Sequence, residues 1–133
     1  MPPPAEERKR VLVVDDEERI RDILRYLLEK AGYEVYTAAN GEAGLKAATS
    51  APPDVIILDV MMPEKDGFTV CGEIKRIGRM RDVPVVFLTA KGGERSLRSA
   101  LHKAAAAFIE KPFKKETVLA VLKEVLASVE EKR

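Results

Sequence analysis

Acidic residues, one threonine and one lysine follow short apolar runs of this chain. They are Asp15 and Asp16 after VLVV, Asp59 after DVIIL, Thr89 after PVVFL, and Glu110, Lys111 and Pro112 after AFI. Three carboxylates brought together repel one another unless they are protonated or a cation lies among them. Oxygen ligands without His or Cys favour Mg²⁺ over Zn²⁺, and Mg²⁺ keeps waters that a phosphate oxygen can replace. These residue types therefore favour phosphoryl chemistry.

Each of these side chains could serve one part of a phosphoryl transfer. Asp59 can attack phosphorus to form an acyl phosphate, Lys111 can neutralise a phosphoryl oxygen, and Thr89 can donate a hydrogen bond to another. Acidic residues at strand ends also cap helices, which would suit Asp15, Glu17 or Glu18 taken singly. Capping does not account for the whole set, because Thr89 and Lys111 are not capping residues and Asp59 precedes VMMP rather than a helix.

Five short apolar runs, rich in β-branched residues, predict five strands that would position these side chains. The runs are VLVV (11–14), YEVYTA (33–38), DVIIL (54–58), PVVFL (84–88) and AFI (107–109). Four of them are continuously apolar rather than alternating. Continuous runs are typical of strands that are buried on both faces of a parallel sheet.

Helical patterns separate the predicted strands. The clearest is an apolar stripe that ends at Gly32 and consists of Ile20, Ile23, Leu24, Leu27, Leu28 and Ala31. Asn40 can cap a second helix, and Asp66 can cap a third that carries Val70, Cys71, Ile74 and Ile77. A fourth helix is predicted over 97–104 and a fifth over about 115–129.

Alternating strands and helices predict an α/β fold: a flavodoxin-like, doubly wound, five-stranded parallel sheet in the order 2-1-3-4-5, with five helices. Ligands of such sheets bind at the carboxyl ends of the strands, where the strand order reverses. The polar residues that follow the strands are therefore expected to converge. Residues 10–127 form the predicted domain, between a polar N-terminal tail at 1–9 and a polar C-terminal tail at 128–133.

Length and composition indicate one domain and little bulk attraction to charged polymers. The 133 residues are 46% hydrophobic and 34% charged, with a net charge of +1, so we expect no direct nucleic-acid partner and no membrane partner. No apolar run approaches the roughly 20 residues that cross a bilayer, and the single cysteine, Cys71, is expected to be a buried apolar residue. A cytoplasmic location is the expectation.

Four sequence signatures carry a resemblance to a known family: VLVVDDE, ILDVMMPEKDGF, LTAK and FIEKPF. From about Arg10 to Leu126, the chain resembles the receiver domain of bacterial two-component response regulators. The resemblance implies a signalling switch rather than an enzyme. It also implies a histidine kinase or phosphotransfer protein that supplies the phosphoryl group from a phosphohistidine, while the receiver assists the transfer and its own dephosphorylation. The downstream target or output domain is not specified by the sequence.

The resemblance also assigns a role to each site residue. Asp59 is the implied phosphoacceptor, and Thr89 and Lys111 contact the phosphoryl group. The implied Mg²⁺ ligands are Asp15, Asp16, Asp59 and the backbone carbonyl of Met61.

A conformational change is implied as well, in which Thr89 moves toward the phosphoryl group and Phe108 turns inward. Plain core packing is the alternative role for Phe108. Met61 and Lys91 are candidates for controlling water access to the acyl phosphate, with exposed loop residues as the alternative. The Lys111-Pro112 bond is expected to be cis, because a lysine that turns back into a crevice suits a tight X-Pro bend.

The chain departs from the family at KAAAAF (103–108), where receivers commonly have Gly-Ala-Asp-Asp before the aromatic residue. Ala resists the left-handed conformation that Gly would adopt there by roughly 1 kcal/mol. We expect the fourth helix either to run past His102, a solvated residue, or to end with strain at Ala104. The surface beside the last strand would then lose acidic character. A harmless substitution is the alternative.

Other functions fit less well or stay open. An aspartate-nucleophile phosphatase of the haloacid dehalogenase group needs a second aspartate two residues after the first, where this chain has Met61. A nucleotide site needs a Gly-rich phosphate cradle, which VLVVDDEER does not offer. Two alternatives stay open: a binding module of receiver fold that works without phosphorylation, and a receiver excised from a longer regulator or hybrid kinase.

Overall fold

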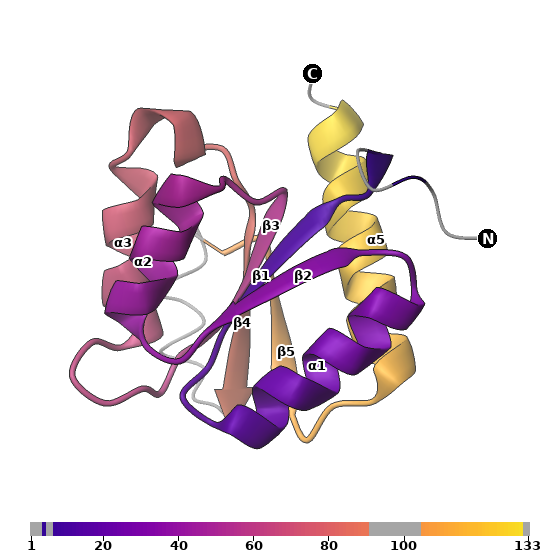
Figure 1. The fold of residues 1–133 in the computed structure, drawn as a ribbon, viewed down its shortest axis with the longest axis horizontal. Coiled ribbons are helices and arrows are strands. Elements are labelled where there is room, and N and C mark those ends of the chain that lie inside the picture. Colours follow the sequence, from indigo (N-terminus) through magenta and orange to yellow (C-terminus); the bar gives the residue numbers. More distant parts are fainter. Residues whose placement is uncertain (1–3, 5–6, 91–104, 132–133) are drawn as a thin grey trace.

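A five-stranded parallel sheet forms the centre of the molecule (Figure 1). The structure is a computed structural model that describes residues 4, 7–90 and 105–131. The sheet has the order β2-β1-β3-β4-β5, so the predicted flavodoxin-like fold and strand order are confirmed. The strands are β1 (Arg10–Val14), β2 (Glu34–Ala38), β3 (Val55–Asp59), β4 (Val85–Ala90) and β5 (Ala107–Lys111).

Three strands extend one or two residues beyond their predicted ends. Asp59 is the last residue of β3 and pairs with Leu88, Thr89 lies within β4, and Lys111 is the last residue of β5. We predicted that these polar residues would follow the strands. The difference arises because backbone pairing continues wherever a neighbouring strand is in register, whatever the side chain. The site residues are therefore held by the sheet itself rather than by loops.

Helices cover both faces of the sheet. Figure 1 shows α2 (Gly41–Ser50) and α3 (Gly67–Lys75) on one side, and α1 (Glu18–Lys30) and α5 (Lys115–Glu131) on the other. A short 3₁₀ helix, η2 (Gly78–Met80), follows α3. The α5 helix runs to Glu131, into the segment that we predicted as a polar tail. The described residues contain no helix that is long and apolar enough to cross a membrane.

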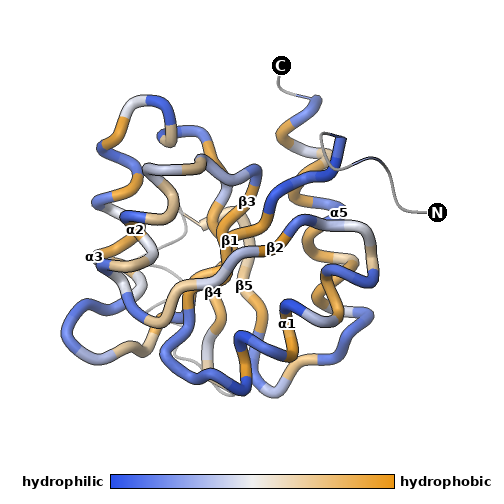
Figure 2. Tube along the Cα trace, in the orientation of Figure 1, coloured by the Kyte–Doolittle hydropathy of each residue, from blue (hydrophilic) through white to orange (hydrophobic). Residues whose placement is uncertain are grey.

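Each face of the sheet has its own apolar core, and alternate strand residues point into the two cores. Leu12, Ile56 and Phe87 pack toward α2 and α3. Val11, Ile57 and Leu88 pack toward α1 and α5. Figure 2 shows the apolar residues gathered on the strands and on the inner sides of the helices. The central strands β1 and β3 are almost wholly buried, as their continuous apolar runs predicted.

The predicted apolar stripe of α1 is wrong at two positions. Leu24 and Leu28, one turn apart, are fully buried, and they define the face that meets the sheet. This orientation turns Ile23 to the edge of the face, where it is 41% exposed, and Ala31 is an exposed C-cap. The α3 helix also ends earlier than predicted, at Lys75, and leaves Ile77 beyond it.

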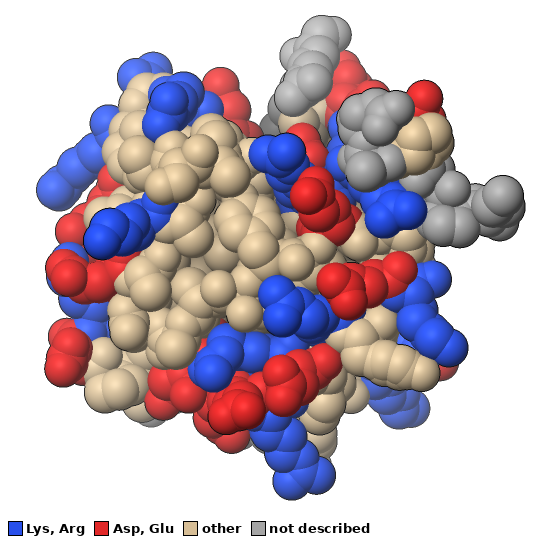
Figure 3. All heavy atoms as spheres, in the orientation of Figure 1, with Lys and Arg blue, Asp and Glu red and all other residues tan. Residues whose placement is uncertain are grey.

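Some expectations fall on residues that the structure does not describe. They concern the fourth helix at 97–104, His102, Lys91 and the start of the alanine run at Ala104. Within the described part, Ala106 donates its N–H to the carbonyl oxygen of Val85 at 2.8 Å, just before β5 begins. On the face drawn in Figure 3, basic and acidic side chains are interspersed, which agrees with the small net charge.

Both predicted helix caps are present. Asn40 Oδ1 accepts the N–H of Ala43 at 2.8 Å, and Asp66 Oδ1 accepts the N–H of Thr69 at 2.8 Å. Each bond satisfies one of the backbone donors that the first turn of a helix leaves unpaired.

The cap of α2 should have a measurable effect on stability. Asn40→Ala is expected to lower the free energy of unfolding by about 1 kcal/mol, because the N–H of Ala43 loses its acceptor. Asn40→Asp keeps a capping oxygen and should stay close to wild type. Urea denaturation measures both variants. An equal loss in the two variants would show that the cap is not the cause.

Candidate functional site

Three carboxylates converge at the carboxyl ends of β1 and β3. Asp15, Asp16 and Asp59 each offer an oxygen atom, and these atoms lie within 4.8 Å of one another. Asp15 and Asp59 are buried, while Asp16 is exposed. The convergence follows from the sheet order, because β1 and β3 are neighbours whose carboxyl ends meet at one edge. All three donors are oxygens, which is the ligand type that Mg²⁺ prefers.

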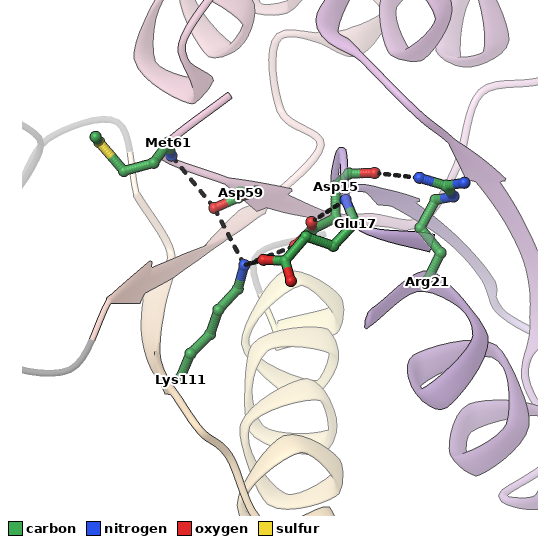
Figure 4. A network of polar contacts seen from close by, with 6 residues as sticks. All are labelled: Asp15, Glu17, Arg21, Asp59, Met61 and Lys111. Atoms are coloured by element: carbon green, nitrogen blue, oxygen red, sulfur yellow. Dashed lines mark hydrogen bonds and ion pairs between the residues drawn. The ribbon is translucent and has the colours of Figure 1, made fainter. Parts of the chain in front are cut away.

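Lys111 reaches into this cluster from the end of β5 (Figure 4). Its Nζ atom lies 2.9 Å from Asp15 Oδ2, 3.5 Å from Asp59 Oδ1 and 3.6 Å from Glu17 Oε1. Glu17 is the N-cap of α1 but makes no side-chain capping bond. Its carboxylate lies beside Lys111 instead, so the capping role considered for Glu17 is wrong.

Backbone and arginine contacts hold the two buried aspartates in place. The N–H of Glu17 donates to Asp15 Oδ1 at 2.9 Å, and the N–H of Met61 donates to Asp59 Oδ1 at 3.2 Å. Arg21 Nη1 donates to the backbone carbonyl of Asp15 at 2.8 Å. Sequence reasoning did not single out Arg21, because an arginine on a helix carries no signal of a contact with the preceding loop.

Burial and like charge dominate the electrostatics of the site. Burial, reinforced by the charge of Asp15, raises the pKa of Asp59 from 3.8 to about 7, although Lys111 opposes the shift. Burial lowers the pKa of Lys111, but the bond with Asp15 and the charges of Asp59 and Glu17 outweigh it and the pKa is raised. Lys111 therefore stays charged, yet it does not compensate the whole cluster. A divalent cation fits this donor set.

Thr89 and Phe108, the predicted switch residues, are both inside the protein. Thr89 is 8% exposed, and its buried Oγ1 has no hydrogen-bond partner among the described residues. Phe108 is half-buried and stacks on Phe87, with ring centroids 5.8 Å apart. In this state Phe108 takes part in core packing. Among the described residues, the Thr89 hydroxyl lacks the partner that a buried polar group needs.

A cavity of about 430 Å³ opens beside the cluster. Its lining consists of Glu17, Ile20, Asp59, Met61, Ala90, Lys111 and Pro112. The side chain of Met61 is 70% exposed at this opening. The Lys111-Pro112 bond is cis, as predicted.

The raised pKa of Asp59 predicts a pH-dependent stability in metal-free buffer. Between pH 3.8 and about pH 7 the folded state keeps a proton that the unfolded state has lost, so stability falls as the pH rises, by about 1.4 kcal/mol per pKa unit. Asp59→Asn removes this dependence. Urea denaturation with a chelator should therefore show the variant more stable than wild type at pH 8, with a gap that closes toward pH 4.

A gap between Asp59→Asn and wild type that stays constant across this pH range would contradict the argument. It would show that a change in packing, rather than the proton on Asp59, separates the two proteins.

Comparisons with known proteins all indicate the same family. The family model described as "Response regulator receiver domain" matches residues 11–123. The alkaline phosphatase synthesis transcriptional regulatory protein PhoP of Bacillus subtilis is 43% identical over 118 residues, which are 89% of this chain and 48% of that protein. The DNA-binding dual master transcriptional regulator RpaA of Synechocystis sp. is 39% identical over 117 residues, which are 88% of this chain and 48% of that protein.

These relatives bear on the expectation that the protein has no direct nucleic-acid partner. The chain spans about half the length of the curated relatives that it matches, and RpaA is named as DNA-binding. The absence of a direct nucleic-acid partner, which we inferred from net charge, is therefore not supported for a full-length protein of this kind.

Solved structures agree with the sequence relatives. The chemotaxis protein CheY4 of Vibrio cholerae superposes with a TM-score of 0.85 at 34% identity, covering 89% of this chain and 98% of that one. A response regulator receiver domain protein from Clostridium thermocellum superposes with a TM-score of 0.85 at 28% identity, covering 94% and 99%. From its sequence, its strand order and these relatives, the chain belongs to the family of response regulator receiver domains.

Proposed function

We propose that this chain is a signalling switch that accepts a phosphoryl group on Asp59 in the presence of Mg²⁺. The proposed ligands of the cation are Asp15, Asp16, Asp59 and the backbone carbonyl of Met61. One observation carries the proposal: the carboxylate of Asp59 is buried within a group of three carboxylates, 3.5 Å from Lys111 Nζ. A structural aspartate would not be kept among like charges at this cost.

The phosphoryl donor in this proposal is a phosphohistidine of a partner histidine kinase or phosphotransfer protein. A carboxylate oxygen of Asp59 forms a bond to phosphorus while the P–N bond of the donor breaks, and the imidazole nitrogen keeps the bonding electron pair. Lys111 neutralises one phosphoryl oxygen, and the hydroxyl of Thr89, which has no partner among the described residues, donates to another. Mg²⁺, when bound, supplies further positive charge at the phosphoryl oxygens.

The raised pKa of Asp59 gives the cation a second role, because Asp59 must be ionised to act as a nucleophile. With its pKa raised to about 7, a large fraction of Asp59 is protonated at neutral pH, and a protonated carboxyl is a poor nucleophile. A cation beside the carboxylate favours the ionised form. The bound cation would therefore keep Asp59 in the ionised form that can attack phosphorus.

Thr89 and Phe108 are the proposed switch residues. The Thr89 hydroxyl, which has no partner among the described residues, would gain one from a phosphoryl group. Its movement would open space for Phe108, which now stacks on Phe87 in the half-buried position described above. Met61, exposed at the mouth of the site, is proposed to control the access of water and so the lifetime of the acyl phosphate. The equivalent role of Lys91 lies outside the described residues.

The downstream step is proposed from the relatives. PhoP and RpaA are named as transcriptional regulators, and this chain covers about half of each. We infer that the receiver controls an output module in the cytoplasm, and that the alanine run at 104–107 affects this output step rather than the chemistry at Asp59.

Phosphorylation of Asp59 is directly testable by intact-mass measurement. After incubation with Mg²⁺ and acetyl phosphate, the wild type should gain the mass of one phosphoryl group, because Asp59 combines a nucleophilic oxygen with Lys111 and the cation. Asp59→Asn and a chelator should each abolish the gain. Asp22→Asn, an exposed position on α1, is the matched control and should be labelled normally. Labelling that persists in Asp59→Asn would refute the assignment.

Removal of Asp16 should have opposite effects with and without metal. Asp16→Asn is expected to weaken Mg²⁺ binding, because one ligand is lost. In metal-free buffer it should raise stability by up to about 1 kcal/mol, a modest gain because Asp16 is exposed. Thermal melts over a Mg²⁺ titration measure both effects. A variant that melts below wild type without metal would contradict the repulsion argument.

A further inference from the structure

One glycine packs directly against the backbone that carries Asp59. Gly67 is the first residue of α3, and its N–H donates to the carbonyl oxygen of Val60 at 2.9 Å. A Cβ atom at this position would lie 3.0 Å from both the carbonyl carbon of Asp59 and the Cα atom of Val60. It would lie closer still to the carbonyl oxygen of Asp59, at a separation that Cβ atoms in proteins essentially never show. Only a residue without a side chain permits this approach.

Two other glycines show what is particular about Gly67. A Cβ at Gly41 would also be too close to a neighbour, but that neighbour is Cγ2 of Val70, a side-chain atom that can move by a rotamer change. Gly72, on α3 itself, has nothing within 4 Å of the Cβ position. At Gly67 the obstructing atoms are backbone atoms of the sheet strand, which cannot rotate away.

The start of α3 is held against the end of β3 by the bond from Gly67 N–H to Val60 and by the fully buried side chain of Val70. Asp66 caps the helix through the N–H of Thr69. Lys65, the residue before the cap, forms ion pairs with Glu73 at 3.1 Å and Glu42 at 3.7 Å. The first turn of α3 therefore cannot retreat freely, and a side chain at Gly67 would push the Asp59–Val60 peptide instead.

We propose that Gly67 is a positioning residue for Asp59. Its missing side chain lets α3 press on the Asp59 peptide, which sets the carboxylate 3.5 Å from Lys111 Nζ and 3.2 Å from the N–H of Met61. The inference rests on the proposed phosphorylation for its effect on rate, and on geometry alone for its effect on the site. Reactions between positioned groups lose about 10²-fold in rate for a misplacement of about 1 Å.

The test compares Gly67→Ala with a matched variant, Gly72→Ala, which adds a methyl group to the same helix in open space. The first readout is the NMR resonance of the Met61 amide in metal-free protein. It reports the hydrogen bond from this amide to the Asp59 carboxylate without any phosphorylation. The second readout is the maximal rate of phosphorylation by acetyl phosphate, which is measured together with the acetyl phosphate concentration that gives half of this rate.

Gly67→Ala is expected to shift the Met61 amide and to lower the maximal rate at least about tenfold, with half-saturation unchanged. Gly72→Ala should keep the stability, the Met61 resonance and the rate of the wild type. A folded Gly67→Ala with the wild-type resonance overturns the proposal. If wild type is not phosphorylated, the proposed function fails, but the Met61 resonance still decides the role of Gly67.

Asp66→Ala replaces Gly67→Ala as the test variant if Gly67→Ala does not fold. It removes only the capping bond to Thr69, costs about 1 kcal/mol and loosens the first turn of α3 against Asp59. The same Met61 resonance should shift, and the maximal rate should fall by a smaller factor than in Gly67→Ala. An unchanged Met61 resonance in Asp66→Ala overturns the proposal.

Discussion

The repulsion between the buried carboxylates of Asp15 and Asp59 is the interaction on which the site depends. The sheet order forces it, because β1 and β3 are neighbours, Asp15 directly follows β1 and Asp59 is the last residue of β3. Lys111 offsets the repulsion only in part, since burial and Asp15 still raise the pKa of Asp59 to about 7. The free protein therefore holds an energetically unfavourable group of negative charges. A cation bound among them would relieve this repulsion.

The rest of the fold tolerates this cost because its apolar cores are extensive. Both faces of the sheet are covered, and the residues of β1 and β3 that precede the aspartates are fully buried apart from Arg10. Backbone donors from Glu17 and Met61 then fix the direction of each carboxylate. Strand pairing and core packing thus supply the stability, while the strand ends carry groups that reduce it.

Much of this arrangement could be predicted from the sequence, and the parts that could not have a common physical origin. Short apolar runs predicted the five strands, their alternation with helical patterns led to the expected doubly wound order, and polar residues at the ends of the runs predicted which side chains meet. Contacts that depend on helix rotation or close backbone packing were not predictable, such as the exposure of Ile23, the bond from Arg21 and the approach of Gly67 to Asp59. Periodicity shows that a helix has an apolar side but not which residues lie at its edge.

The location of Asp59, Thr89 and Lys111 inside paired strands has a consequence for how such domains diversify. Their backbones share the hydrogen-bond register of one sheet, so sequence drift on the outer sides of the helices leaves their spacing intact. The similarity to CheY4, with a TM-score of 0.85 at only 34% identity, is an example of this insulation. Substitutions on the outer sides of the helices can therefore change the surface that the domain presents to other proteins without moving these three residues.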